Sequence, residues 1–213
     1  MIFFICAGYK QQIIKEYFAH YYLYSNDVTF HMGTNKKEII HGSNFDDWNV
    51  TVADTGLNTA TGGRIKRVAK YIGNETFMLT YGDAVGNINL RALLEEHKRS
   101  NKLGTISVYN FGQSKGVVDI SKDGSINAFR EKSNMDGDLI NIGYMVMEPQ
   151  VLDYIGGDST TFENEPMKTL VSKHQLGAYI HKGFWQCMDT MNEKNKLEKL
   201  WATGNAPWKT WKD

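Results

Sequence analysis

Hydrophobic positions in this chain follow two spacings, one typical of strands and one typical of helices. Unbroken apolar runs cover residues 2–7 and 77–81, and the second run is followed by Gly82 and Asp83. Runs of this kind are typical of strands that are buried on both faces of a parallel sheet. Shorter apolar segments predict four further strands, over residues 28–32, 48–53, 105–109 and 178–181.

Helical spacing separates these segments. Between residues 65 and 72, apolar side chains recur at the i, i+3, i+4 and i+7 positions of one helix face, and Gly73 marks the end of that helix. Further helices are expected near residues 13–21, 89–101, 166–171 and 197–201. Strands that alternate with helices predict an α/β fold on a mostly parallel sheet. No repeat or linker divides the chain, so we expect one domain over residues 1–213.

Composition narrows the class of protein. The 24 Lys and Arg residues equal the 24 Asp and Glu residues, so no basic excess supports a nucleic-acid partner. The apolar run at residues 2–7 is short and has no basic segment before it, which favours a buried strand over a signal peptide or membrane span. The two cysteines, Cys6 and Cys187, suggest neither a zinc site nor a disulfide framework, so a cytoplasmic location is expected.

Two aspartates are candidates for metal binding. Asp83 directly follows an apolar strand, at the end of the strand where open α/β sheets bind ligands. A carboxylate there can hold Mg²⁺, although a turn or helix-cap aspartate is an equally good interpretation. Asp189 follows Phe184 and Trp185 where a strand leads into a helix. This pattern indicates either a ligand wall beside a second metal carboxylate or core aromatics beside an N-cap.

Basic and amide side chains suggest anion binding. Residues 61–64, Thr-Gly-Gly-Arg, open a helix, where free N–H groups and the guanidinium of Arg64 can bind an anion. The alternative is a flexible turn before a solvated basic helix. Glu131 and Lys132 follow a strand, and Asn141 opens the next one. A lysine and an amide that face one cleft can hold a sugar phosphate, whereas a surface ion pair and a strand-initiating asparagine are the simpler reading.

Taken together, these segments resemble one family along the whole chain. The resemblance is carried by Thr-Gly-Gly-Arg at 61–64, Tyr-Gly-Asp at 81–83, Glu-Lys at 131–132, Ile-Asn at 140–141 and Trp-Gln-Cys-Met-Asp-Thr at 185–190. They resemble the glucose-1-phosphate cytidylyltransferases, a branch of the sugar-phosphate nucleotidylyltransferase family. The resemblance implies a Rossmann-like sheet flanked by helices, of the nucleotide-diphospho-sugar transferase type.

This resemblance also implies a reaction and a set of site residues. CMP would pass from CTP to α-D-glucose 1-phosphate, giving CDP-glucose and pyrophosphate, in a homo-oligomer that serves surface-polysaccharide synthesis. The implied residues are Asp83 and Asp189 for Mg²⁺; Thr59, Arg64, Gly82 and Asp83 for the nucleotide; and Glu131, Lys132, Asn141 and Trp185 for the sugar phosphate. Arg64 and Lys132 would supply catalytic positive charge. The attacking phosphate oxygen is already anionic, so the reaction needs positioning and charge neutralisation rather than a general base.

The chain departs from this family at its beginning. Family members start with a strand and a loop of the type Gly-Gly-x-Gly-Thr-Arg-Leu, and Met1 falls where their second strand begins. Because such a loop supplies N–H groups and an arginine to a triphosphate, we expect these 213 residues alone to bind CTP poorly and to turn over slowly. Two alternatives stay open: a nucleotidylyltransferase of other base or sugar specificity, and a non-catalytic relative that binds sugar phosphates.

Overall fold

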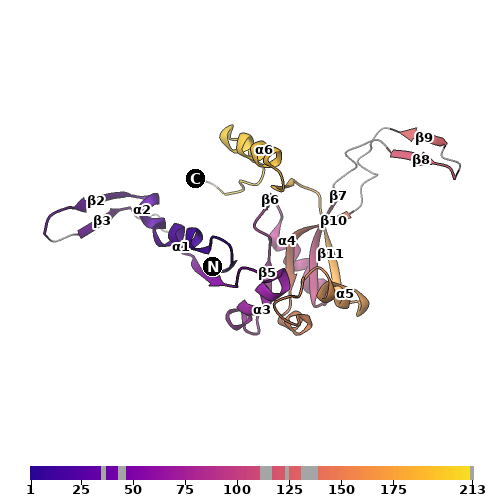
Figure 1. The fold of residues 1–213 in the computed structure, drawn as a ribbon, viewed down its shortest axis with the longest axis horizontal. Helices are drawn as coiled ribbons and strands as arrows, with labels where there is room; N and C mark the ends of the chain where they lie inside the picture. Colours follow the sequence, from indigo (N-terminus) through magenta and orange to yellow (C-terminus); the bar gives the residue numbers. More distant parts are fainter. Residues whose placement is uncertain (35–36, 43–46, 111–116, 123–124, 131–138, 212–213) are drawn as a thin grey trace. The chain divides into compact units, whose positions relative to one another are not determined.

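The computed structural model describes residues 1–34, 37–42, 47–110, 117–122, 125–130 and 139–211. By internal contacts the chain divides into two compact units. The first unit comprises Met1–Gly73 and Leu152–Lys168, and the second comprises Asn74–Val151 and Thr169–Asp213. Figure 1 labels the elements of both. The single domain expected from the sequence stays a prediction.

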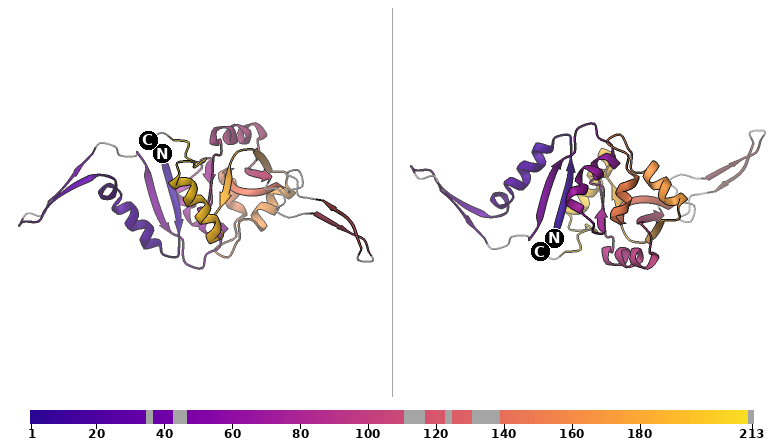
Figure 2. Two further views of the ribbon diagram at one scale, coloured as in Figure 1. Left: turned by 90° about the horizontal axis from the view of Figure 1, so that it is seen from above. Right: turned by 90° about the horizontal axis from the view of Figure 1, so that it is seen from below.

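A parallel pair of strands forms the centre of the first unit. β1 (Ile2–Ala7) pairs with β4 (Asn49–Asp54) along its whole length, and the ladder with α1 beside it is visible in Figure 2. α3 (Thr61–Ile72) contacts β1 and buries Ile65 and Val68. The aromatic rings of Phe4 on β1 and Tyr71 on α3 stack with centroids 5.5 Å apart. The strand over residues 2–7 and the helix that ends before Gly73 are thus confirmed, but the strand is less buried than expected, because Ile2 and Phe3 are exposed.

The connection from β1 to β4 contains one more strand than the sequence suggested, and most of its side chains are exposed. It contains α1 (Gln11–Ala19), α2 (Tyr21–Ser25) and the antiparallel hairpin of β2 (Asp27–His31) and β3 (Lys37–His41). Neither helix has a buried residue. We expected one strand followed by a polar loop, and the structure adds β3 because Ile39 and Ile40 pair with Thr29 and Val28.

The second unit contains a four-stranded mixed sheet with the strand order β11-β7-β10-β5. β11 (Leu176–His181) runs parallel to β7 (Gly104–Asn110), whereas β10 (Leu139–Met147) is antiparallel to both β7 and β5 (Phe77–Leu79). α4 (Leu90–Ser100) contacts β7, β10 and β11 and buries Leu93 and His97. With parallel strand pairs and helices in both units, the α/β prediction is confirmed.

Shorter elements complete the second unit. β6 (Ala84–Gly86) pairs antiparallel with β12 (Trp185–Cys187), and α6 (Met191–Ala202) contacts β12. β8 (Val117–Ile120) and β9 (Ile126–Arg130) form a hairpin. The 3₁₀-helix η1 (Pro149–Tyr154) and α5 (Glu165–Ser172) lie at the boundaries between the two units in sequence. Within the described ranges, no helix is both long and apolar enough to cross a membrane.

Candidate functional site

Asp83 and Asp189 lie at the same end of the short β6–β12 ladder. Ala84 is paired with Cys187, and the Met188 N–H donates to the Asp83 carbonyl at 2.8 Å. This register places Asp83, which precedes β6, and Asp189, which follows β12, on neighbouring backbones. Both residues are exposed. The structure therefore places the backbones of the two aspartates that the sequence singled out for Mg²⁺ next to each other, and their role as metal ligands stays a prediction.

The helix that follows Asp189 has its own cap. Thr190 is the N-cap of α6, and its hydroxyl accepts a hydrogen bond from the Glu193 N–H at 3.3 Å. Glu193 completes a capping box by accepting from the Thr190 N–H at 2.9 Å. The Glu193 carboxylate also accepts from the Thr190 hydroxyl at 3.0 Å, and this bond, together with the one from the Thr190 N–H, holds the pKa of Glu193 below its usual range. The interpretation of Asp189 as the N-cap is therefore wrong, and its carboxylate is left for another role.

A thiol lies beside these acids. Donor atoms of Cys187, Asp189 and Glu193 all lie within 4.8 Å of one another. Burial raises the pKa of the Cys187 thiol, which donates to Glu193 Oε1 at 3.5 Å, and a thiol in this state is a weak metal ligand. Mg²⁺ takes oxygen ligands. The carboxylates of Asp83 and Asp189 fit that ion better than a set that includes Cys187.

A bulge in β10 forms one side of the site. Pairing with β7 is irregular between Asn141 and Met145, and Asn141 Oδ1 accepts from the Gly143 N–H at 3.0 Å. Gly143 has φ 82°, and a Cβ at this position would lie 2.5 Å from the Tyr81 ring. Glycine is therefore required here for two reasons, the left-handed backbone and the close ring. Tyr81, two residues before Asp83, connects the bulge to the carboxylates.

Trp185 meets the same bulge from β12. Its indole N–H donates to the Ile142 carbonyl at 3.1 Å, and its ring centroid lies 6.2 Å from that of Tyr109. With its N–H bonded and a second ring beside it, the indole is held in one orientation. Asn141, Trp185, Asp83 and Asp189 are therefore connected through successive contacts within the second unit.

Gly82 and the Glu131-Lys132 pair complete the predictions for this unit. Among the described atoms, none lies within 4 Å of a Cβ built on Gly82, so the backbone there is accessible to a ligand. Glu131 and Lys132 lie outside the described residues. Their contacts with a sugar phosphate stay predictions.

Arg64 lies at the carboxyl ends of β1 and β4 in the first unit. Its Nη1 donates to Thr55 Oγ1 at 2.8 Å and its Nη2 to the Leu57 carbonyl at 3.2 Å. The Thr55 hydroxyl in turn donates to the Ala7 carbonyl at 2.8 Å. A Cβ on Gly8 would lie 2.5 Å from Arg64 Nη1, so glycine is needed for the guanidinium to reach this place. Arg64 therefore fixes the loop that follows β4, and Thr55 connects this loop to the end of β1.

The glycines before Arg64 serve close packing. A Cβ on Gly62 would lie 2.7 Å from the Thr160 carbonyl oxygen, and one on Gly63 would lie 2.6 Å from Asp158 Cα. Both glycine N–H groups donate to the Thr160 carbonyl, at 2.9 and 3.3 Å. Because a carbonyl already occupies them, the expectation that these two N–H groups bind an anion is wrong. Thr59 is 9% exposed and packs beside Gly63, so little of its surface is accessible, and its predicted contact with a nucleotide stays a prediction.

Sequence reasoning missed the residues that support Trp185. The Tyr109 ring lies near the rings of both Trp185 and His181, and the centroids of the Tyr109 and His181 rings are 6.0 Å apart. Asn87 Oδ1 accepts from the Phe184 N–H at 2.7 Å, which fixes the backbone just before Trp185. The available signal was the position of Tyr109 at the carboxyl end of a predicted strand. Nothing local in the sequence distinguishes Asn87.

Comparisons with known proteins identify the family of this chain. The sequence matches the family described as "Nucleotidyl transferase" over residues 1–213. It is 47% identical over 210 residues to a Salmonella typhimurium protein named glucose-1-phosphate cytidylyltransferase, covering 98% of this chain and 81% of that one. This match confirms the resemblance seen in the motifs.

Solved structures share the fold. A UDP-glucose pyrophosphorylase in complex with UDP-glucose aligns with a TM-score of 0.63 at 13% identity, covering 95% of this chain and 81% of that one. HddC from Yersinia pseudotuberculosis aligns with a TM-score of 0.55 at 18% identity, covering 92% and 75%. At such identities the likeness concerns the fold alone, whereas the sequence match extends over the whole chain. This chain belongs to the nucleotidyl transferase family.

Proposed function

We propose that this protein transfers CMP from CTP to α-D-glucose 1-phosphate, which gives CDP-glucose and pyrophosphate. The identity to the Salmonella typhimurium cytidylyltransferase supports the choice of substrates. The structural observation that supports the proposal is the hydrogen bond from the Met188 N–H to the Asp83 carbonyl, because it joins the backbones that carry Asp83 and Asp189 in the unit that also contains the Asn141 bulge and Trp185.

Mg²⁺ is the proposed metal, and Asp83 and Asp189 would hold it. Carboxylate oxygens are suitable ligands for this hard cation, which usually keeps several waters and binds substrate phosphates. When bound, the ion would neutralise charge on the nucleotide phosphates. Both aspartates are exposed and come from different segments, so neither needs to be drawn out of the core to bind a ligand.

The sugar phosphate is proposed to bind along the bulge of β10. Asn141 Oδ1 accepts from the Gly143 N–H, whereas its amide NH₂ forms no hydrogen bond among the described residues and is proposed to donate to a sugar hydroxyl. The fixed indole of Trp185 offers an apolar wall. Glu131 and Lys132 are proposed to contact the hydroxyls and phosphate, with Lys132 supplying positive charge.

The reaction requires one bond to form and one to break. A phosphate oxygen of glucose 1-phosphate attacks the α-phosphorus of CTP, and the bond from that phosphorus to the bridging oxygen of pyrophosphate breaks. No proton has to be removed from the nucleophile. Arg64 and Thr59 of the first unit are proposed to contact the nucleotide, and the Arg64 guanidinium would offset its negative charge. The Gly82 backbone is a further proposed nucleotide contact, in the second unit.

Product analysis tests this proposal against its alternatives. The protein is incubated with glucose 1-phosphate, Mg²⁺ and each of CTP, UTP, dTTP and GTP, and pyrophosphate and nucleotide sugar are measured. We expect CDP-glucose to be the main product and Asp83→Asn to abolish most of it. A preference for another nucleotide would point to the other-specificity alternative. Glucose 1-phosphate binding with no pyrophosphate from any nucleotide would point to the non-catalytic one.

A homo-oligomer is also proposed. The exposed segment from α1 to β3 carries large apolar side chains, including Tyr17, Phe30 and Ile40. An isolated two-stranded hairpin has marginal stability in water, and exposed apolar groups of this size typically mark interfaces. A second copy of the chain is the proposed partner for this surface.

A further inference from the structure

The second unit has a cavity of about 330 Å³ at the start of β7. Its polar lining comes from the last turn of α4 and the residues that follow β10: His97, Lys98, Asn101, Lys102, Glu148 and Gln150. β7 runs from Gly104 beside this cavity to Tyr109 beside Trp185. A strand of that length spans roughly 20 Å. The cavity therefore lies at the opposite end of β7 from Trp185 and is separate from the proposed sugar-phosphate site.

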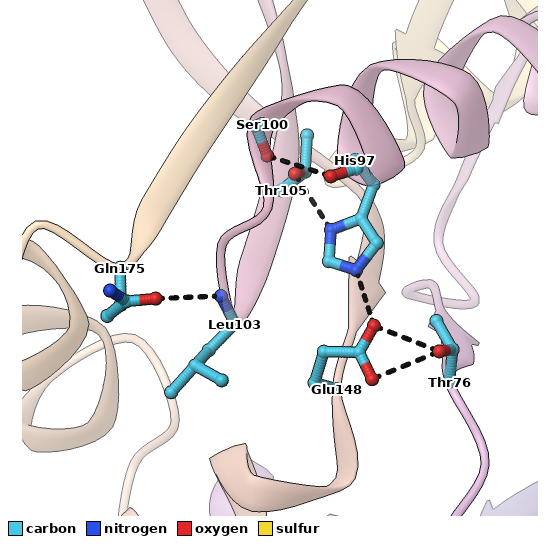
Figure 3. A network of polar contacts seen from close by, with 7 residues as sticks. All are labelled: Thr76, His97, Ser100, Leu103, Thr105, Glu148 and Gln175. Atoms are coloured by element: carbon cyan, nitrogen blue, oxygen red, sulfur yellow. Dashed lines mark hydrogen bonds and ion pairs between the residues drawn. The ribbon is translucent and has the colours of Figure 1, made fainter.

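The inner wall of the cavity is held by a buried hydrogen-bond network. His97 is 2% exposed, and its Nδ1 and Nε2 hydrogen-bond with Thr105 Oγ1 at 2.9 Å and Glu148 Oε1 at 3.0 Å (Figure 3). The Thr76 hydroxyl donates to the same carboxylate at 2.9 Å. Both ring nitrogens and the carboxylate are thus fixed before any ligand arrives, which is the preorganisation that a binding site requires.

The lining of the cavity also carries positive charge. Lys98 and Lys102 both line it, and Lys102 Nζ donates to the His174 carbonyl, a neutral group, at 2.5 Å. In the part of the chain that the structure describes, neither lysine forms an ion pair with a carboxylate. The amides of Asn101 and Gln150 add further donors. Two ammonium groups without acidic partners match a dianionic group better than a single carboxylate.

We propose that this cavity binds a small phosphate monoester whose organic part carries hydroxyl groups. Lys98 and Lys102 bind the phosphate, and the Glu148 carboxylate, which also lines the cavity, accepts hydrogen bonds from the hydroxyls. The cavity volume falls within the range of about 300–1,000 Å³ that small-molecule sites occupy. Neither the metal carboxylates nor the sugar-phosphate contacts of the proposed reaction take part.

Calorimetric titration of the full chain tests the site, with glycerol 3-phosphate as the probe and glycerol as the neutral comparison. We expect saturable binding with a dissociation constant of about 1 mM or tighter. The double variant Lys98→Gln, Lys102→Gln should weaken it at least tenfold. Arg91→Gln removes one positive charge from the same helix outside the cavity lining, and should leave binding unchanged. Hydrogen exchange should slow in residues 97–104 when the probe binds.

The outcomes separate this site from the substrate site. Binding that survives Asp189→Asn but is lost in the double lysine variant supports the proposal, whatever the enzyme does with CTP. No saturation by about 10 mM probe would overturn it. Equal losses in Arg91→Gln and in the double variant would also overturn it, because they would indicate attraction to overall charge. Circular dichroism of each variant verifies folding.

Discussion

At the scale of single residues, Asp189 is proposed to have a chemical role, whereas its neighbour Thr190 has a structural one. Asp189 is exposed, whereas Thr190 caps α6. We expect Asp189→Asn to lower the rate of pyrophosphate release roughly 100-fold, as loss of a group that stabilises transition-state charge does, with little change in stability. Thr190→Ala should instead cost about 1 kcal/mol of stability through the lost cap and keep most of the rate. Steady-state kinetics and thermal unfolding of both variants measure the two effects, and equal rate losses would contradict the assignment.

Gly143 is the residue whose backbone shapes the sugar-phosphate side. Its φ of 82° and the Tyr81 ring 2.5 Å from a built Cβ make any side chain costly there. We expect Gly143→Ala to destabilise the fold by about 1–3 kcal/mol and to raise the KM for glucose 1-phosphate.

Gly157→Ala is the matched control for this prediction. No described atom lies within 4 Å of a Cβ built on Gly157, and its φ is not in the left-handed region. Denaturant unfolding should therefore show little change for it. A stable Gly143→Ala protein with an unaltered KM would show that the bulge does not position Asn141.

At the scale of elements, β7 offers two neighbouring positions with opposite expectations. Among the described buried side-chain atoms, Ser107 Oγ has no hydrogen-bond partner, whereas Thr105 Oγ1 bonds His97 at 2.9 Å. Ser107→Ala should be neutral or slightly stabilising because it removes an unsatisfied hydroxyl. Thr105→Val should cost about 1–3 kcal/mol because it leaves a buried ring nitrogen unpaired. Urea unfolding of the two variants gives the comparison, and a larger loss for Ser107→Ala would contradict it.

The capping box of α6 predicts a pH dependence of stability. Hydrogen bonds from Thr190 lower the pKa of Glu193 in the folded state, so the unfolded chain binds the proton more readily. The resulting stabilisation is present above the usual glutamate pKa and is lost as the pH falls through the lower folded value. We expect the thermal midpoint of Glu193→Gln to fall less steeply with acidification than that of the original protein. Identical slopes would exclude a contribution from this carboxylate.

Local pattern predicted both buried and exposed elements. The spaced apolar residues of α3 reach the core, whereas α1 was expected from the same kind of pattern and has no buried residue. β3 was missed because its sequence, Lys-Glu-Ile-Ile-His, shows no alternation of apolar and polar positions. Apolar spacing therefore predicted where several elements form, but not how far tertiary packing covers them.

Candidate residues were found singly, but their proximity could not be predicted. The backbones of Asp83 and Asp189 are neighbours because the three-residue strands β6 and β12 pair. Nothing in the sequence of either strand indicates that the other is its partner. Tyr109 and His181 meet through the equally non-local pairing of β7 and β11. Conversely, the Thr-Gly-Gly-Arg segment suggested N–H groups free for an anion, and a distant carbonyl, that of Thr160, occupies two of them.

At the scale of the whole molecule, the exposed apolar segment of the first unit predicts self-association. Phe30 on β2 is 53% exposed, and Val171 on α5 is similarly exposed at 58%. Light scattering should show an oligomer of the 24.2 kDa chain, and Phe30→Asp should shift it toward monomer because a charge cannot be buried unpaired at an apolar interface. Val171→Asp introduces the same charge outside the α1–β3 segment and should leave the molar mass unaltered. A monomeric original protein, or equal dissociation by both variants, would show that the α1–β3 segment is not the interface.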